Sequence, residues 1–253
     1  MKAVVLAGGK GTRLYPLTKT INKHILPVWT SPLLWYPLWS LKNAGFKEVL
    51  IVTDRKDSGD IIGICGSGKD LGMDITYRIQ DQAGGVAEAL GLAESYVGEE
   101  EFICILADNV FTYDLNLYID KYLMLGKDKP HCSILTCPVD DPLRYALIER
   151  TDGKITKILE KPTMVISDEA LTGIAIFDWW ALKTIHGLKP SARNELEYTD
   201  VLNSYIEHGW LDAQILDKNT WADAGTFSGI DRASKIVADA HFLPFPEIDR
   251  KDL

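Results

Sequence analysis

The chain has 253 residues, of which 46% are hydrophobic and 25% are charged, the balance of an ordinary globular protein. This length suits one α/β domain with a full core. With 27 Lys and Arg against 36 Asp and Glu, the formal net charge is −9, which argues against a general binder of nucleic acid. No apolar run reaches membrane-spanning length and no signal-peptide pattern precedes the first strand, so we expect a cytoplasmic protein without a membrane partner.

The first half of the chain alternates between strand and helix patterns. We expect strands at 2–7, 47–53, 75–80 and 102–107, and helices at 33–44, 57–64 and 86–96. This alternation implies right-handed crossovers and a mainly parallel sheet, whose ligands bind beyond the carboxyl ends of the strands.

The second half is richer in strands separated by turns. We expect strands at 132–138, 145–150, 154–159, 171–177 and 213–216, and helices at 179–186, 199–208 and 227–240. No linker composition divides the chain, so we expect one domain over residues 1–253. The four cysteines form no CxxC pair, and we interpret them as reduced packing residues: Cys65, Cys104, Cys132 and Cys137.

A glycine-rich turn follows the first strand, at Gly8, Gly9 and Gly11. Glycines let backbone N–H groups approach an anion closely, and nearby cations neutralise its charge. Four cations follow within the next stretch: Lys10, Arg13, Lys19 and Lys23. A turn with solvated lysines would also explain this pattern. The sequence matches neither the dinucleotide fingerprint nor the GxxxxGK[ST] phosphate loop.

Residues 1–28, MKAVVLAGGKGTRLYPLTKTINKHILPV, resemble the signature of the sugar-nucleotide pyrophosphorylases, a nucleotidyltransferase family. They are most similar to its short-type members that transfer a thymidylyl group to glucose 1-phosphate. The resemblance implies a GT-A-like fold, with a Rossmann-like, mainly parallel but mixed sheet flanked by helices and a smaller β-rich sugar-binding part. Residues 1–130 would mainly bind nucleotide and residues 131–240 would mainly bind sugar phosphate.

The implied reaction condenses dTTP with α-D-glucose 1-phosphate to give dTDP-glucose and pyrophosphate, with Mg²⁺, as in dTDP-rhamnose and polysaccharide biosynthesis. Three alternatives stay open: a uridylyltransferase that uses UTP, a cytidylyltransferase, and a non-catalytic regulator that binds nucleotide sugars. We also expect a homo-oligomer. The resemblance fades after about residue 234, and 241–253 are too few for the extra helices of the effector site in longer members.

Attack on the α-phosphorus needs two anionic substrates held in line, and cations that absorb the developing charge. The resemblance implies that Arg13 holds the nucleotide phosphates and that Lys23 contacts the phosphorus under attack. Asp108 follows the strand at 102–107, and Asp223 lies in the motif WADAGT at 221–226. Both match the family's Mg²⁺ ligands, and Mg²⁺ takes few carboxylates beside phosphate oxygens.

The implied nucleotide-binding residues are Leu6, Ala7, Gly8, Gly9, Gly11, Thr12, Gln80, Gly85 and Asp108. Gln80 can pair with a pyrimidine through its donor and its acceptor together, and Gly85 offers backbone groups without steric hindrance. The loop at 77–89 lacks the proline and the aspartate of many longer members, which leaves the choice between thymine and uracil open.

The implied sugar-phosphate-binding residues are Asn109, Tyr145, Glu160, Lys161, Gly173 and Arg193. Lys161 and Arg193 would clamp the phosphate, while Glu160 and Tyr145 would bond sugar hydroxyls. Three departures from the family add bulk or a polar group here, so a hexose 1-phosphate is better supported than glucose itself: Ala146, Leu171 and Asn194. The five histidines form no metal-binding pattern, and His24 would contact phosphate or pack in the core.

Overall fold

A computed structural model of the chain describes residues 1–126 and 128–245. Its described residues form one mixed sheet of nine strands and two small two-stranded ladders. β1 (Lys2–Ala7) lies in the middle of the large sheet, parallel to β4 (Glu48–Asp54) on one side and to β6 (Phe102–Leu106) on the other. β5 (Asp74–Gln80) continues the parallel part beyond β4. These four strands confirm the sequence prediction to within one residue at each end.

The other part of the sheet is mainly antiparallel and is built around β11 (Glu169–Phe177), which pairs with β6. The remaining strands are β8 (Cys132–Pro138), β9 (Leu147–Thr151), β10 (Lys154–Leu159) and β12 (Leu211–Ile215). β8 and β9 each pair with β11, and β10 and β12 lie outside them. The register of β11 against β8 shifts between Leu171 and Ala175. The sheet therefore bends at the segment that contains Gly173.

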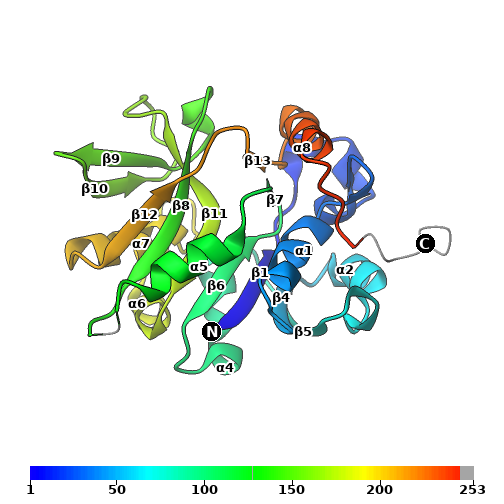
Figure 1. Cartoon of the computed structure of the whole chain (residues 1–253), viewed down its shortest axis with the longest axis horizontal. Coiled ribbons are helices and arrows are strands. Elements are labelled where there is room, and N and C mark those ends of the chain that lie inside the picture. Colours follow the sequence, from blue (N-terminus) through cyan, green and yellow to red (C-terminus); the bar gives the residue numbers. More distant parts are fainter. Residues whose placement is uncertain (127, 246–253) are drawn as a thin grey trace.

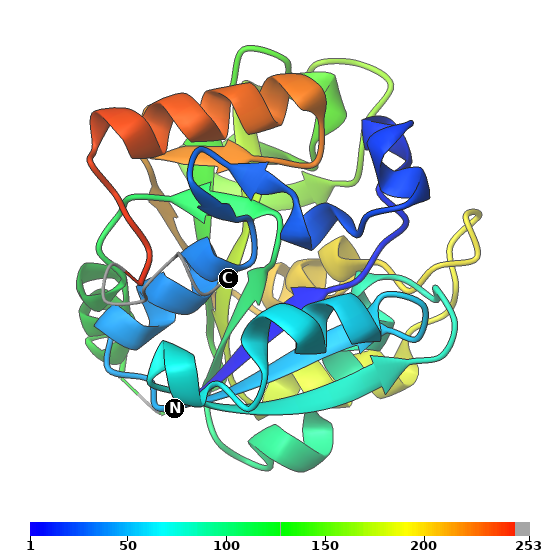
Figure 2. The same cartoon turned by 90° about the vertical axis from the view of Figure 1, so that its right-hand side faces the viewer.

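Helices cover both faces of the sheet (Figures 1 and 2). Successive residues of β1 point to opposite faces, so Ala3 and Val5 belong to one core, and Val4 and Leu6 to the other. The first core includes residues of α1 (Trp35–Asn43), α2 (Ser58–Cys65) and α5 (Leu115–Leu123). The second includes residues of α3 (Val86–Gly91), α6 (Trp179–Gly187) and α7 (Tyr198–Glu207). This is the α/β architecture that the sequence predicts.

Two predictions about helices are corrected. The helix expected over 86–96 is interrupted and forms α3 and the short α4 (Glu94–Val97). The sequence analysis missed α5, whose first turn is capped by the Asp114 side chain and whose Tyr118 and Tyr122 are buried. Five single-turn 3₁₀ helices complete the helical segments: Thr12–Leu14, Leu17–Lys19, Lys23–Ile25, Lys69–Leu71 and Pro142–Arg144.

The small ladders were also missed from the sequence. β2 (Pro27–Val28) pairs with β3 (Ser31–Pro32), and β7 (Asn109–Phe111) pairs with β13 (Trp221–Asp223). α8 (Phe227–Asp239) lies across the second ladder (Figure 2) and packs a third, smaller core against it. The ladder thus brings a segment near the end of the chain next to the carboxyl end of β6.

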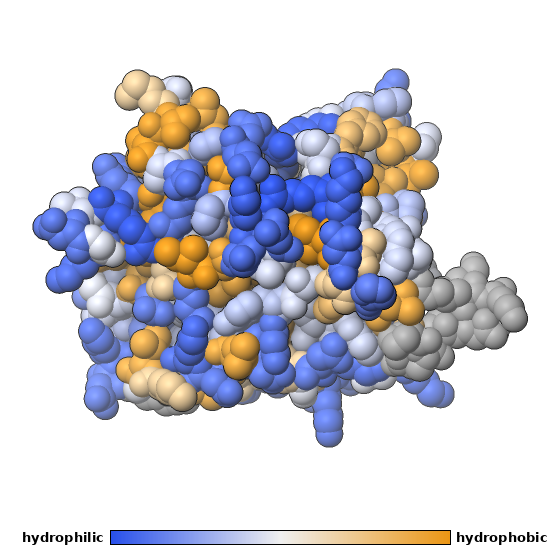
Figure 3. Space-filling view, turned by 45° about the horizontal axis from the view of Figure 1, so that its top comes forward, coloured by the Kyte–Doolittle hydropathy of each residue, from blue (hydrophilic) through white to orange (hydrophobic). Residues whose placement is uncertain are grey.

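The surface carries several separate apolar patches, seen in orange on the face of Figure 3. No helix within 1–126 and 128–245 is long and apolar enough to cross a membrane. All four cysteines are buried and free, in agreement with the packing role expected for them. Burial raises the pKa of the Cys65 thiol to about 12, so this thiol stays protonated near neutral pH.

Candidate active site

Two cavities meet at Asp108, just beyond the carboxyl end of β6. The first, of about 200 Å³, is lined by residues that follow β1 and β5. The second, of about 240 Å³, is lined mainly by residues of the second half of the chain. Three residues line both cavities: Val86, Leu106 and Asp108. Most of the predicted nucleotide and sugar-phosphate residues therefore line two adjoining cavities.

The glycine turn forms one wall of the first cavity. Gly9 and Gly11 have φ values of 107° and 59°, a region that favours glycine. A Cβ on Gly11 would lie 3.0 Å from Cγ2 of Thr18, whose hydroxyl donates to the Gly11 carbonyl at 2.7 Å. Among the predicted nucleotide residues, the cavity lining contains Leu6, Gly8, Gly9, Gln80, Gly85 and Asp108, and does not contain Ala7, Gly11 or Thr12.

Lys23 is held against Asp108. Its Nζ donates to Oδ2 of Asp108 at 2.6 Å, and the two side chains are only 11% and 13% exposed. Burial alone would raise the pKa of Asp108, but the positive charge around it, above all the Lys23 ammonium together with Arg13, outweighs burial and lowers this pKa. His24 is buried with its Nδ1 3.0 Å from Oδ1 of Asn22, and burial and Lys23 lower its pKa to about 3. His24 therefore packs as a neutral side chain.

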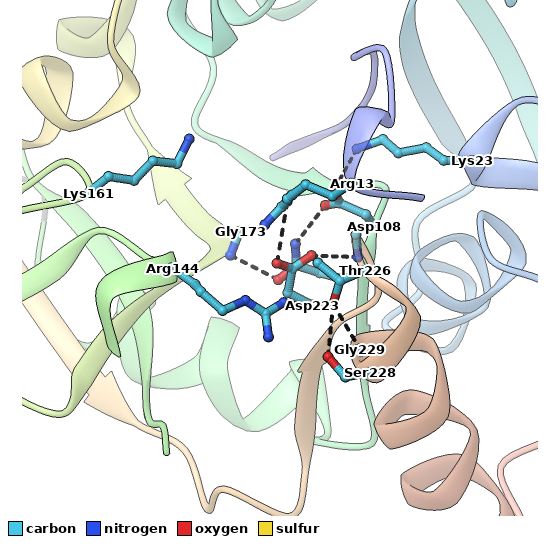
Figure 4. Close-up of polar contacts among 12 residues, drawn as sticks. Arg13, Lys23, Asp108, Arg144, Lys161, Gly173, Asp223, Thr226, Ser228 and Gly229 are labelled. Atoms are coloured by element: carbon cyan, nitrogen blue, oxygen red, sulfur yellow. Dashed lines mark hydrogen bonds and ion pairs between the residues drawn. The ribbon is translucent and has the colours of Figure 1, made fainter. Parts of the chain in front are cut away.

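The ladder of β7 and β13 brings Asp223 beside Asp108. Asp223 stands opposite Asn109 in this ladder, and the next residue, Ala224, donates its N–H to the Asp108 carbonyl at 2.8 Å. Burial and the Asp108 carboxylate raise the pKa of Asp223. Arg13 partly offsets this repulsion, with Nη2 3.8 Å from Oδ2 of Asp223 (Figure 4). Two of the predicted cations and both predicted metal ligands are thus gathered in one place.

This donor set fits Mg²⁺. Two desolvated carboxylates repel each other, as the raised pKa of Asp223 reflects, and a divalent cation between them would remove the repulsion. Carboxylate oxygens are the ligands that Mg²⁺ prefers, and the ion keeps several waters or phosphate oxygens. Within the part of the chain that the structure describes, no group of three or more His, Cys, Asp or Glu side chains is arranged so that it could hold a metal ion by itself. Asp108 and Asp223 would therefore have to hold the ion with help from substrate.

Asn109 is buried at the junction of the two cavities. Its Oδ1 accepts hydrogen bonds from the Gly173 N–H at 3.0 Å and from Nε1 of Trp221 at 2.6 Å, and its Nδ2 donates to Oδ1 of Asp108 at 3.2 Å. A Cβ on Gly173 would lie 2.7 Å from Cβ of Leu106, so the strands approach closely here. Asn109 was predicted to bind sugar, but its side chain is engaged in joining β7, β11 and β13.

The second cavity contains most of the predicted sugar-phosphate residues. Its lining includes Asn109, Tyr145, Glu160, Lys161 and Gly173, together with Ala146 and Leu171. The Tyr145 ring packs against that of Trp221, with centroids 5.7 Å apart. Lys161 is 54% exposed, and its Nζ lies 3.6 Å from Oε1 of Glu160. Asn194, expected near the sugar, is instead an exposed residue at φ 58°, a conformation that Asn tolerates better than most residues.

Arg193 does not line either cavity, and its guanidinium is bound to carboxylates. It donates to Glu197 through Nη2 at 2.6 Å and Nε at 3.1 Å, and Nη2 lies 3.3 Å from Oε1 of Glu160. The hydrogen bonds that Arg193 donates to Glu197 raise the pKa of Arg193. Arg193 is therefore connected to the second cavity by its hydrogen bond to Glu160, which lines that cavity. The sequence analysis gave no role to Glu197.

Arg144 is a further cation that the sequence analysis missed. It lines the second cavity together with Arg13 and Lys161 and lies beside Asp223 (Figure 4). Its Nη2 donates to Oγ1 of Thr226 at 2.7 Å, which fixes the segment that follows Asp223. Its position directly before Tyr145 was the only signal in the sequence.

The Gln80 side chain is partly engaged inside the protein. Its Nε2 donates to Oε2 of Glu88 at 2.7 Å and to the Gly85 carbonyl at 3.3 Å. The expectation that Gln80 would offer a donor and an acceptor to the base together is therefore wrong, because the donor side is occupied. Glu88 had no assigned role in the sequence analysis.

A parallel sheet edge with a glycine turn, fixed cations and paired aspartates defines a nucleotide-handling enzyme of the transferase type. The chain belongs to the nucleotidyl transferase family, which it matches over residues 2–240. This confirms the predicted family.

Named relatives agree with this assignment. The chain is 35% identical over 240 residues to glucose-1-phosphate thymidylyltransferase of Neisseria meningitidis, covering 94% of this chain and 82% of the relative. It is 33% identical to the enzyme of the same name from Mycobacterium tuberculosis, with the same coverage of both chains. A crystal structure from Bacillus anthracis, provisionally named glucose-1-phosphate thymidylyltransferase and solved with a sucrose, has a TM-score of 0.89 at 40% identity, covering 97% of this chain and 98% of its own. The predicted GT-A-like nucleotidyltransferase fold is confirmed.

Proposed function

We propose that the chain condenses dTTP with α-D-glucose 1-phosphate to give dTDP-glucose and pyrophosphate, with Mg²⁺ as cofactor. The observation that carries the proposal is the joint placement of Lys23 with Asp108, and of Arg13 with Asp223, where two cavities meet. The names of the relatives support the choice of substrates. A regulator without catalysis would not need these four charged groups, so their arrangement favours an enzyme.

In this reaction a phosphate oxygen of the sugar 1-phosphate attacks the α-phosphorus of the triphosphate. The bond from that phosphorus to the β-phosphate oxygen breaks, and pyrophosphate leaves with the bonding electron pair. The protein has little covalent chemistry to perform, because holding two anions in line supplies much of the rate. The first cavity would hold the nucleotide and the second the sugar phosphate, with the α-phosphorus near Asp108.

The charged residues then have distinct tasks. Lys23 and Arg13 are fixed cations that would stabilise charge on the phosphates in the transition state. Asp108 and Asp223 would hold Mg²⁺, and the ion would supply positive charge that offsets the charge of the phosphates. Lys161 and Arg144 line the second cavity, where they would neutralise the phosphate of the sugar.

The test is pyrophosphate release across dTTP, UTP, CTP, ATP and GTP, each with the 1-phosphates of glucose, galactose and mannose. We expect the highest kcat/KM with dTTP or UTP and glucose 1-phosphate. Higher turnover with UTP than with dTTP would make the chain a uridylyltransferase of the same fold. Comparable rates with ATP or GTP would contradict a pyrimidine pocket at Gln80 and Gly85. If no pyrophosphate is released with any hexose 1-phosphate, the proposed function is wrong.

A further inference from the structure

Gln80 ends β5 and is 8% exposed in the wall of the first cavity. Both partners of its Nε2 are groups that only accept: the carboxylate of Glu88 and the backbone carbonyl of Gly85. If the amide were rotated by half a turn, its Oε1 would face the Glu88 carboxylate oxygen and the Gly85 carbonyl oxygen, which repel it. The orientation of this amide is therefore determined, with Nε2 toward α3 and Oε1 toward the glycine turn. A Cβ on Gly8 would lie 3.4 Å from this Oε1.

Glu88 is fixed as firmly as Gln80. Its Oε2 accepts a second hydrogen bond, from the Gly84 N–H at 2.9 Å, and it packs so closely on Gly84 that a Cβ there would collide with it. The same loop is tied to the second half of the chain. Leu196 donates its N–H to the Gly84 carbonyl at 2.7 Å and accepts from the Ala87 N–H at 3.2 Å. The carboxylate is thus positioned before any ligand arrives.

We propose that Glu88 is a positioning residue that makes the base pocket selective for uracil or thymine over cytosine. The inference rests on the proposed function, in that the first cavity takes the base of a pyrimidine nucleotide. By holding Nε2 of Gln80, Glu88 leaves Oε1 as the group that can meet the base. Uracil and thymine carry an N–H donor at ring position 3, which this oxygen can accept. Cytosine carries a bare acceptor nitrogen there, which this oxygen would repel.

The size of the effect follows from the same chemistry. A site built to accept a substrate N–H rejects an analogue without it strongly, because buried acceptors are then left facing each other. We expect kcat/KM for UTP to exceed that for CTP by about 100-fold or more. The 5-methyl group that distinguishes thymine from uracil is not at ring position 3, where Oε1 of Gln80 would act. Glu88 should therefore have no effect on the preference between thymine and uracil.

The experiment compares Glu88→Ala, Glu88→Gln and Asp81→Ala with the wild type, using UTP and CTP. Loss of the carboxylate frees the Gln80 amide to turn, so Glu88→Ala should lower the UTP-to-CTP ratio about tenfold or more. Glu88→Gln keeps one acceptor oxygen and should retain the wild-type ratio. Asp81 is an exposed neighbour of Gln80, and its removal is the matched control. A merely structural role for Glu88 would lower both rates together and leave the ratio unchanged, which would overturn the proposal.

Binding measurements separate this inference from the proposed reaction. Calorimetric titration of the wild type with dTTP, dCTP and N3-methyl-dTTP in Mg²⁺ buffer needs no sugar phosphate and no turnover. We expect dTTP to bind much more tightly than the other two, because both lack the N–H at position 3. If this order holds without turnover on any hexose 1-phosphate, the proposed function fails and the inference stands. Equal affinity for dTTP and N3-methyl-dTTP would overturn the inference even if the Glu88 variants fail to fold.

Discussion

The two adjoining cavities are built from different kinds of structure. The first lies at the carboxyl ends of parallel strands, and its cation Lys23 is 11% exposed and bonded to a carboxylate that follows β6. The second is lined mainly by residues of β11, of β13 and of the loops that precede β9 and follow β10, and its cation Lys161 is 54% exposed. The interaction between two charges is strongest where water is excluded. If the proposed function holds, the chemical step should depend on the first cavity and the junction, while the second cavity should mainly select the sugar.

The junction is where the largest effect is expected. Asp108→Asn and Asp223→Asn keep the shape of the side chain and remove its charge, so turnover should fall by about 100-fold or more. Pyrophosphate release across a Mg²⁺ titration measures the loss, and thermal melting controls for folding. Either variant with near-wild-type turnover, or full wild-type activity in EDTA, would remove the metal site from the proposal.

A second prediction concerns Gly173, which packs tightly where the two cavities meet. In Gly173→Ala the new methyl group would collide with the Asn109 side chain and lie 2.7 Å from Cβ of Leu106. Overpacking of this kind costs about 1–3 kcal/mol of unfolding free energy. Gly63→Ala in α2 is the control, because a Cβ there meets nothing within 4 Å. Chemical denaturation should separate the two variants, and equal stabilities would show that β11 can shift at its bulge.

The difference between the cavities is tested by Lys161→Ala. Removing a partly exposed cation should raise KM for the sugar 1-phosphate about tenfold and leave KM for the nucleotide nearly unchanged. Lys157→Ala, which removes an exposed lysine from β10, is the matched control. A change confined to the nucleotide KM would mean that the two cavities are assigned the wrong way round.

The last prediction concerns His24 and the dependence of stability on pH. Its folded-state pKa of about 3 lies below the ordinary 6.5, so the unfolded chain binds a proton there between these values and the folded chain does not. Stability from this group is present above about pH 6.5 and is lost progressively as the pH falls towards 3, because only the unfolded chain takes up the proton in this range. His24→Gln should flatten the acid side of the stability curve. If the acid side of the stability curve keeps its slope in His24→Gln, the acid sensitivity does not come from His24.

Local sequence pattern predicts where the first cavity lies. The apolar runs of β1 and β6 and the glycines after β1 are sufficient to place a ligand site at this edge of the sheet. The roles of Asn109 and Gln80 depend on partners from other segments, and no local pattern shows which of their atoms stay free. The ladder of β7 and β13 was missed for the same reason, since each of its strands is too short for a periodicity.

That ladder also has a consequence for the order in which the chain folds. Trp221 and Asn109 are joined by a hydrogen bond although 112 positions separate them in the sequence. Contacts of such high sequence separation form late, because a long loop must close before they contribute. As the chain is synthesised, the glycine turn, Lys23 and Asp108 are complete long before Asp223 emerges. A nascent chain could therefore fold around its nucleotide cavity without the second carboxylate, and would gain it only when α8 packs against the finished sheet.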